Sequence, residues 1–256
     1  MFHQKQIIFL LLFVSLISFS ACSSKNQVNE KLNSEMPKKI IWAWERAEDL
    51  RFLETEKFGV AFLAQTLTLT QDEVVFRPRR QPLELPENIY VIAVTRIETV
   101  KENSKRPALS DEQRKKIVAL IKKTLDLPNV KAVQTDFDVV VSERKFYRSL
   151  INDLKKELPE NTPLTITSLA SWCVGDSWFN DFPIDEAVPM AFEMGADSER
   201  IRDFLAKEND WNEPLCRGSY GISIDDPLLN VKLKPERRIY YFKSKPWEKS
   251  DLERMK

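Results

Sequence analysis

Two aspartates and a glutamine interrupt an otherwise apolar segment near the middle of the chain. The segment, residues 130–142, reads VKAVQTDFDVVVS and has the composition of a buried β-strand. Side chains alternate along a strand, so Gln134, Asp136 and Asp138 share one face, with successive Cα atoms about 6.6 Å apart. Neighbouring carboxylates repel, so one is expected to have a raised pKa while the other stays ionised. That combination suits an acid that works with a base or a nucleophile.

The same residues also permit a purely structural interpretation. In this alternative, Asp136 and Asp138 pair with Arg96, Lys39 or helix ends, because an unpaired buried carboxylate is costly. We favour the chemical interpretation because the single histidine, His3, lies in the N-terminal segment. Without a histidine, neither Ser-His-Asp catalysis nor a His-based zinc site can form.

Composition narrows the chemistry further. The five glycines form neither a G-x-x-x-x-G-K-S/T nor a G-x-G-x-x-G pattern, so phosphate-binding loops are absent and we expect no cofactor. We also expect no metal, although a metal bound by carboxylates alone stays open without support from the sequence. Lys plus Arg equals Asp plus Glu at 39 each, which gives no indication of a nucleic-acid partner. Carboxylates are therefore the expected catalytic groups.

The N-terminal segment predicts export and lipidation. Residues 7–19 form a short apolar run, which fits a signal peptide and is too short to span a bilayer comfortably. The run leads into FSAC, residues 19–22, which resembles the lipobox of bacterial lipoproteins, and Ser23 resembles lipoproteins sorted to the outer membrane. An uncleaved membrane anchor is the alternative. We expect a signal peptide at 1–21, a lipidated Cys22 with a tether at 22–37, and a location on the periplasmic face of the outer membrane.

Two further cysteines, Cys173 and Cys216, follow Cys22 in the chain. In an oxidising compartment they either form a disulfide, which we favour, or remain two thiols. The disulfide would contribute about 4 kcal/mol in the chain-entropy model.

The remaining sequence alternates apolar strands with helices. Strands are expected at residues 39–44, 59–64, 89–96, 130–141, 164–172, 186–192, 219–225 and 238–242. Helices are expected at 45–56, 110–125, 143–158 and 197–208, and a truncated helix at 247–256, whereas 67–86 reads as extended or hairpin structure. This order predicts an α/β fold, a single (β/α)8 TIM-like barrel over 38–256. It is irregular, with the helices after strands two, five and seven short or missing. A doubly wound open sheet is the alternative, but its nucleotide-binding loops are absent.

Active sites of such barrels lie at the C-terminal ends of the strands. Phe137 and Val139 suit the helix layer, so the polar face of their strand should point inward. Candidates at other strand ends are Glu45, Arg96, Glu98, Trp172, Asp176, Glu193, Asp225, Asp226 and Tyr241. Carboxylates with Trp and Tyr suit carbohydrate, because aromatic faces stack on sugar C–H surfaces and acids bond to hydroxyls. The cluster Arg77, Arg79 and Arg80 could meet an anionic glycan, although a solvated sheet edge is the commoner role.

These candidates receive distinct expected roles. Asp138 is the principal catalytic carboxylate, Asp136 tunes it, and Glu45 or Glu193 lies opposite. The expected substrate contacts are Trp172 and Tyr241 as sugar platforms, with Arg96, Gln134 and Asp176 as polar partners. Trp42 and Trp44 share one face of the first strand, and their sequence does not say which.

Several motifs resemble an uncharacterised bacterial family. They are WER-x-EDLRFL (44–53), GVAFLA (59–64), VQTDFD (133–138), ITSLASWCVGDSW (166–178) and DEAVPMAFEMG (185–195). Members of the family are often lipoproteins, and the family is similar to TIM-barrel glycoside hydrolases, which implies a barrel and a sugar-processing site. More distantly, Asp136 and Asp138 resemble the last two aspartates of the D-x-x-D-x-D-x-E strand of family-eighteen chitinases. Val140 stands where those enzymes have their proton-donating Glu.

The sequence therefore predicts a membrane-anchored, glycoside hydrolase-like protein that acts on a glycan through carboxylate chemistry. The alternative is a non-catalytic glycan-binding or envelope scaffold lipoprotein. Val140 favours the alternative, whereas the remaining acid cluster favours the enzyme.

Overall fold

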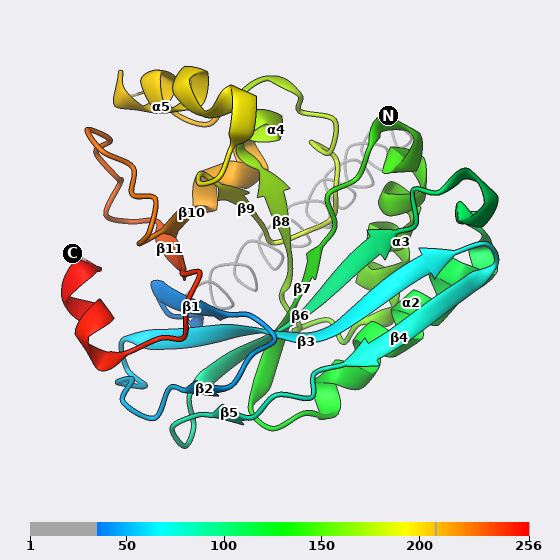
Figure 1. Ribbon diagram of the computed structural model, residues 1–256, viewed down its shortest axis with the longest axis horizontal. Helices are drawn as coiled ribbons and strands as arrows, with labels where there is room; N and C mark the ends of the chain where they lie inside the picture. The colour runs from blue at the N-terminus through cyan, green and yellow to red at the C-terminus, as the bar shows by residue number, and fades with distance from the viewer. Residues whose placement is uncertain (1–34, 208, 256) are drawn as a thin grey trace, which may run out of the picture. The chain divides into compact units, whose positions relative to one another are not determined.

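The computed structural model describes residues 35–207 and 209–255. The expected signal peptide and Cys22 lie outside the described residues. Within them, eight parallel strands form a closed barrel, ordered β1-β11-β10-β9-β8-β7-β6-β3, and pairing of β3 with β1 completes the ring (Figure 1). The strands are β1 (Lys39–Ala43), β3 (Phe58–Thr70), β6 (Tyr90–Thr99), β7 (Val130–Asp136), β8 (Leu164–Leu169), β9 (Glu186–Met190), β10 (Ser219–Ser223) and β11 (Arg238–Phe242). The barrel prediction is confirmed, and the open sheet is wrong.

The strand that carries the two aspartates is shorter than expected. β7 ends at Asp136 rather than at Val141. Beyond it the chain turns, with the backbone N–H of Val139 donating to the carbonyl of Phe137, and then enters a short 3-10 helix. Asp138 therefore lies in the loop that follows the strand, at the end of the barrel where the cavity lies.

Two segments replace helices on one side of the barrel. β3 extends past its neighbours and folds back into β4 (Glu73–Pro78) as an antiparallel hairpin, which confirms the expected extended segment. The helix expected at 45–56 is wrong. Part of this segment is β2 (Glu48–Asp49), which pairs in parallel with β5 (Leu83–Glu84). This tertiary pairing overrides the helical spacing of Leu50 and Leu53.

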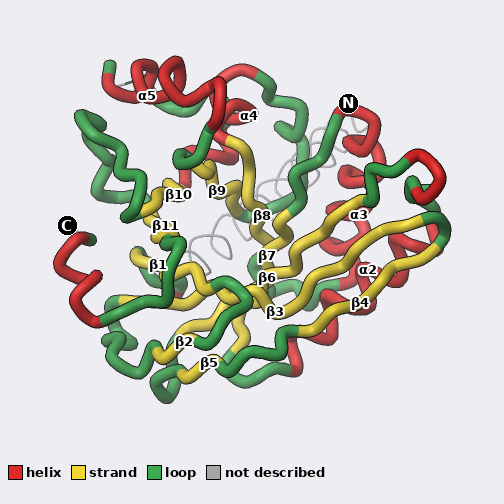
Figure 2. Tube along the Cα trace, in the orientation of Figure 1, coloured by secondary structure: helices red, strands yellow, loops and turns green. Residues whose placement is uncertain are grey.

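Three of the described α-helices lie where the sequence places them, with small shifts in their bounds: α2 (Asp111–Lys123), α3 (Arg144–Glu157) and α5 (Ser198–Ala206). The fourth, α4 (Ala170–Gly175), replaces the end of the strand expected at 164–172. Ser110 and Gln113 form a capping box at the start of α2, whereas α3 has no side-chain cap. α4 has six residues, and the connection from β10 to β11 is a loop (Figure 2), so the irregularity of the barrel is confirmed.

Short 3-10 helices complete the described elements. They are η1 (Asn103–Lys105), η2 (Thr124–Asp126), η3 (Val141–Glu143), η4 (Gly195–Asp197), η5 (Pro214–Gly218) and η6 (Lys249–Arg254). A disulfide between Cys173 and Cys216 joins α4 to η5, with a Cα–Cα distance of 6.0 Å. No helix among the described residues is long and apolar enough to cross a membrane.

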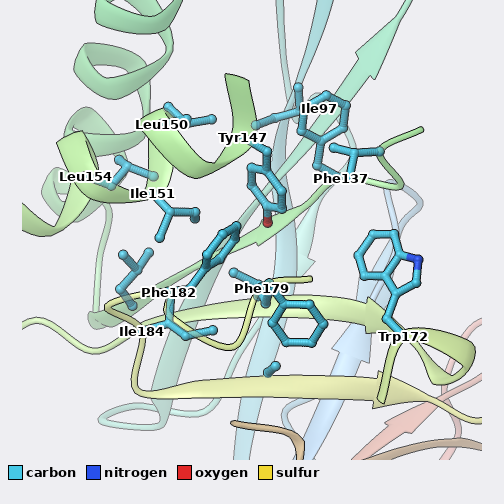
Figure 3. Packing of buried hydrophobic residues seen from close by; sticks show 14 of the residues in the cluster. Ile97, Phe137, Tyr147, Leu150, Ile151, Leu154, Trp172, Phe179, Phe182 and Ile184 are labelled. Carbon is cyan, nitrogen blue, oxygen red and sulfur yellow. The ribbon is translucent and has the colours of Figure 1, made fainter. Parts of the chain in front are cut away.

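The larger apolar core lies between the barrel and the helices α2, α3 and α4. Figure 3 shows side chains of α3, including Tyr147 and Leu150, directed toward the same cluster as Trp172 and Phe179. The Tyr147 hydroxyl lies 2.6 Å from the Thr135 hydroxyl, so its one polar atom is satisfied within the core. This packing fixes the outer face of β7 and thereby turns its alternate residues into the barrel.

Candidate functional site

A cavity of about 780 Å³ opens at the C-terminal end of the barrel. Side chains at the ends of several strands converge on it, as expected for this fold. Among the described residues, its wall contains six carboxylates and two arginines: Glu45, Glu98, Asp136, Asp138, Glu193, Asp197, Arg77 and Arg96. The structure thus brings together all four carboxylates expected to be catalytic, together with Arg96.

Asp136 is the most firmly held of these carboxylates. It is 4% exposed, and its two oxygens have different partners. Thr167 on β8 donates its hydroxyl to Oδ1 at 2.7 Å, and Nη1 of Arg96 on β6 lies 3.0 Å from Oδ2. Neighbouring strands on both sides therefore fix the position of the Asp136 carboxylate in the cavity wall.

Asp138 lies beside this fixed charge but is reached by solvent. The surrounding walls of the cavity reduce its hydration, and together with the negative charge of Asp136 they raise its pKa from 3.8 to about 6. The Arg96 guanidinium acts in the opposite direction. Asp138 can therefore exchange a proton near neutral pH, as a general acid requires.

Arg96 also continues an ion-pair chain along the cavity wall. Its Nε donates to Glu98 at 3.0 Å, and Glu98 in turn lies 3.6 Å from Nη2 of Arg77 on the β4 hairpin. The long hairpin brings Arg77 to the barrel mouth, so the unusual β3–β4 extension contributes directly to the site. Both arginines of the wall are thus engaged by carboxylates.

Glu193 follows β9 and adopts a backbone conformation that is rare for its residue type. Its φ is +48°, in the left-handed region that a side chain disfavours. The carboxylate of Asp226 accepts the Glu193 N–H at 3.1 Å, and Asp226 itself is paired with Arg202 on α5. A strained residue at a cavity is a recognised sign of function. Here the strain is held by a defined network.

Glu45 lies directly after β1 on the same wall. The backbone N–H of Arg80 reaches its carboxylate at 3.4 Å, and the side chain is otherwise exposed. Arg79, the nearby basic residue, donates instead to backbone carbonyls, among them that of Trp44 at 2.6 Å. The arginine cluster of the sequence thus separates, with only Arg77 in the cavity wall.

An aromatic wall faces these carboxylates. The ring centroid of Trp42 lies 4.3 Å from Trp44 and 5.2 Å from Phe242, and Phe192 lies 4.6 Å from Phe242. Trp42 and Trp44 therefore point inward, which the sequence left open. Trp44 and Phe192 are half-buried and accessible, which is the condition that an aromatic platform for a sugar needs.

The aromatic residues expected as sugar platforms lie elsewhere. Trp172 is buried in the core against Trp178 and Phe179, because β8 ends at Leu169 and the helix α4 turns the side chain away (Figure 3). Tyr241 packs outside the barrel, with its hydroxyl donating to the carbonyl of Met255. The assignments of both residues as platforms are therefore corrected.

Two polar residues expected to contact substrate also lie outside the cavity wall. Gln134 does face the barrel interior, but it lies below the cavity, where it accepts from Trp42 Nε1 at 3.0 Å and donates to Thr165. It supports the aromatic wall instead of touching the cavity. Asp176 pairs with Arg144 at the start of α3, as one partner of a surface ion pair.

Glu143 follows the loop after β7, and its carboxylate does not line the cavity. Glu143 accepts from the backbone N–H of Val140 at 3.0 Å, from Thr99 at 2.7 Å and from Lys101 at 3.0 Å. Its carboxylate is buried and fully engaged, so it braces the loop that carries Asp138. Glu143 therefore does not supply the acid that chitinases carry at the position of Val140.

Two smaller cavities continue the main one. A cavity of about 440 Å³ shares Arg96, Asp136 and Asp138 with it, and one of about 310 Å³ shares Trp44, Phe192 and Glu193. Asp136 and Asp138 therefore lie between two hollows instead of at a blind end. The three hollows thus adjoin one another at the mouth.

Several wall residues were missed by sequence reasoning. They are Thr167, Phe192, Asp197 and Phe242. Phe242 had a readable signal, since it alternates with Tyr241 on β11 and shares the inward face of Tyr240. Thr167 had none, because a threonine on a buried strand is ordinary.

Comparisons with known proteins add only resemblance at the level of the fold. No protein-family model and no curated protein matches the chain. Similar solved structures include the spore cortex-lytic enzyme SleL of Bacillus cereus, with a TM-score of 0.45 and 13% identity over 73% of this chain and 51% of that one. Another is the chitinase domain of the spore coat protein CotE of Clostridium difficile, with a TM-score of 0.40 and 11% identity over 82% of this chain and 65% of that one. The chain thus spans about half to two thirds of these proteins, and its family remains a prediction.

Proposed function

We propose that the barrel binds an extended glycan across its mouth and hydrolyses a glycosidic bond beside Asp138. The observation that carries the proposal is the pair of aspartates in the cavity wall. Asp136 is a fixed charge held by Arg96 and Thr167, and Asp138 beside it has a pKa of about 6. Asp136 thus helps to raise the pKa of Asp138, which can act as the acid of glycoside cleavage, and the second carboxylate that such cleavage needs comes from another strand end.

In this mechanism Asp138 donates a proton to the oxygen of the bond that breaks. Glu193 or Glu45, from other strand ends, acts from across the cavity as the base that activates water or as the nucleophile. Trp44 and Phe192 hold the sugar by its C–H faces. The continuous hollows give room for sugar units on both sides of Asp138.

Location forms the second part of the proposal. The lipobox-like FSAC motif at residues 19–22 supports lipidation of Cys22 and attachment to the periplasmic face of the outer membrane. A glycan of the cell envelope would then lie within reach of the barrel. Labelling with a radioactive fatty acid, lost in Cys22→Ser, tests this part separately from catalysis.

The second candidate function is glycan binding without cleavage, and Val140 favours it. To separate the two, the full-length protein is incubated with envelope and dietary polysaccharides, and the released reducing ends are measured. We expect release by the wild type and by Asp72→Asn, an exposed control at the hairpin turn. Asp138→Asn should lose about 100-fold or more in rate. Binding with no cleavage by any variant would establish the non-catalytic function instead.

A further inference from the structure

In the part of the chain that the structure describes, the basic residues that line the cavity and its two smaller hollows all pair with carboxylates of the protein. Arg96 pairs with Asp136 and Glu98, and Arg77 pairs with Glu98. In the smaller hollows, Lys101 pairs with Glu143, Lys243 pairs with Asp251, and Arg46 pairs with Glu48. Arg46 also donates to three backbone carbonyls of residues 243–245. The cations therefore complete the protein's own network.

Three carboxylates of the same mouth are in the opposite situation. Among the described residues, Glu45, Asp138 and Glu193 have no basic side chain within 4.0 Å. Ordinary surface acids are solvated and dispersed, but these three converge on one cavity from β1, β7 and β9. Glu193 is in addition held there against its backbone preference by Asp226. The cavity thus presents unpaired negative charge and little available positive charge.

The aromatic wall strengthens the same preference. Trp44, Phe192 and Phe242 line the hollow that also contains Glu193. The face of an aromatic ring attracts a cation as well as a sugar C–H surface. A carboxylate beside an accessible ring is therefore a suitable site for a protonated amine, and it repels a carboxylate of a substrate.

From this distribution of charge we propose that the mouth selects glycans that carry protonated amino sugars, namely hexosamines without their N-acetyl groups, and rejects uronic-acid glycans. The inference rests on the proposed function, because it assigns a substrate class to the same cavity. Glu193 and Glu45 are its specificity-determining residues: both charges attract the amines, and the one that is not the base or nucleophile of the proposed cleavage pairs with an amine directly. The amine lies near them, and Asp138 remains free to carry the proton.

The test compares three oligosaccharides of equal length in the Asp138→Asn background, so that cleavage does not interfere. They are a glucosamine oligomer, its fully N-acetylated counterpart and a galacturonate oligomer. Affinity for the full-length protein is measured at a mildly acidic pH, where the amines are protonated. We expect the glucosamine oligomer to bind at least about tenfold more tightly than the acetylated one, with galacturonate weakest. The preference should shrink as salt is raised, because screening weakens charge pairing.

Matched variants assign the preference to residues. Glu193→Gln and Glu45→Gln should each reduce the ratio of the affinity for the glucosamine oligomer to the affinity for its acetylated counterpart. Glu160→Gln should not, because this exposed acid lies in the loop before β8, at the other end of the strand from the cavity. Arg77→Gln tests the rival assignment, in which Arg77 binds a carboxylate of the substrate. Arg77 is the best candidate for that role because its pair with Glu98 is the longest ion pair of the mouth, at 3.6 Å. Tighter galacturonate binding that disappears in Arg77→Gln would overturn the inference.

The outcomes separate this inference from the proposed function. Equal binding of the three oligomers overturns the charge selection but leaves glycan binding intact. If the protein binds none of the three oligomers and none of the polysaccharides of the cleavage assay, both the charge selection and the proposed function are overturned. Tight glucosamine binding that is insensitive to salt and to both glutamate variants also contradicts the assignment.

Discussion

Two arginine–carboxylate clusters lie at opposite ends of the same barrel. At the N-terminal ends of the strands, Glu186 and Arg238 pair with exposures of 3% and 4%, and the Tyr240 hydroxyl donates to the same glutamate. At the C-terminal ends, Arg96 is 33% exposed and serves Asp136 and Glu98 together. The first cluster matches one cation to one anion in a sealed site, whereas the second carries excess negative charge beside a cavity.

This difference separates the structural role of a charge from its chemical role. A sealed pair must be complete, because each buried ion alone would cost several kcal/mol. An open cluster can leave a carboxylate such as Asp138 unpaired, because water shares the cost. Burial by the cavity walls and the charge of Asp136 then raise the pKa of Asp138, which suits the mouth, rather than the bottom, for the proposed chemistry.

The largest expected effect lies at the sealed end. Arg238→Met leaves Glu186 buried without its cation, so we expect the free energy of unfolding to fall by about 3–5 kcal/mol. Urea denaturation followed by circular dichroism measures it. The double variant Glu186→Leu/Arg238→Met should recover most of the loss, because no charge then remains. A loss of under about 1 kcal/mol for the single variant would contradict the comparison.

At the open end the corresponding change should cost less. Arg96→Met removes the cation of Asp136, but Thr167 still donates to that carboxylate and water reaches the cluster. We expect a loss of about 1–3 kcal/mol in the same denaturation assay. Because Arg96 lowers the pKa of Asp138, its removal should also move the proton exchange of Asp138 to higher pH. A larger loss here than at Arg238 would reverse the assignment of the two ends.

A smaller and opposite effect is expected from Asp138→Asn. Since folding raises the pKa of Asp138 from 3.8 to about 6, the folded protein binds more protons between those values. Stability therefore falls as pH rises through that window, and the penalty is complete above it. The variant should be more stable than wild type above pH 6 by roughly 1 kcal/mol, a figure kept low because the side chain is solvent-exposed.

Thermal melts at several pH values test the sign of this effect. Above pH 6 the stabilities of wild type and Asp138→Asn should differ by the full ionisation penalty of the previous paragraph. Below the ordinary pKa of 3.8 this penalty should be absent. Asp72→Asn, an exposed aspartate, serves as the control. If the variant is less stable than wild type at neutral pH, the carboxylate of Asp138 is a stabilising partner and the account fails.

The smallest effect concerns the position of Glu193. Asp226→Ala removes the acceptor that holds the Glu193 N–H, so we expect glycan affinity to fall by about three- to tenfold while stability changes little. Asp226→Asn keeps a side-chain oxygen at this position and should retain most of the affinity. Equal loss in both variants would assign the effect to the ion pair with Arg202 instead.

Local patterns in the sequence predicted the barrel and the inward face of β7. The alternation of side chains correctly predicted that Gln134 and Asp136 face the interior, because the residues that alternate with them belong to the face of β7 that α3 covers. The location of the site was predicted from the residues that directly follow each strand, since the C-terminal ends of parallel strands meet at one end of the barrel. For this reason Glu45, Asp136, Asp138 and Glu193 were found without any contact being known.

The errors came from features that local patterns do not encode. Trp172 was misplaced because nothing local marks the end of β8 at Leu169, and a helix begins there instead. Tyr241 was misplaced because proximity to a strand end was considered without its alternation with Phe242. The strain at Glu193 arises from the tertiary contact with Asp226, which no sequence pattern records.

The proton on Asp138 is the feature on which the account depends most. Its pKa can be measured by carbon-13 NMR of the labelled carboxyl, assigned by comparison with Asp138→Asn. We predict a titration near pH 6 in the wild type, displaced toward 3.8 in Asp136→Asn, where the neighbouring charge is removed. A wild-type titration near 3.8, or one that Asp136→Asn leaves unchanged, would contradict it.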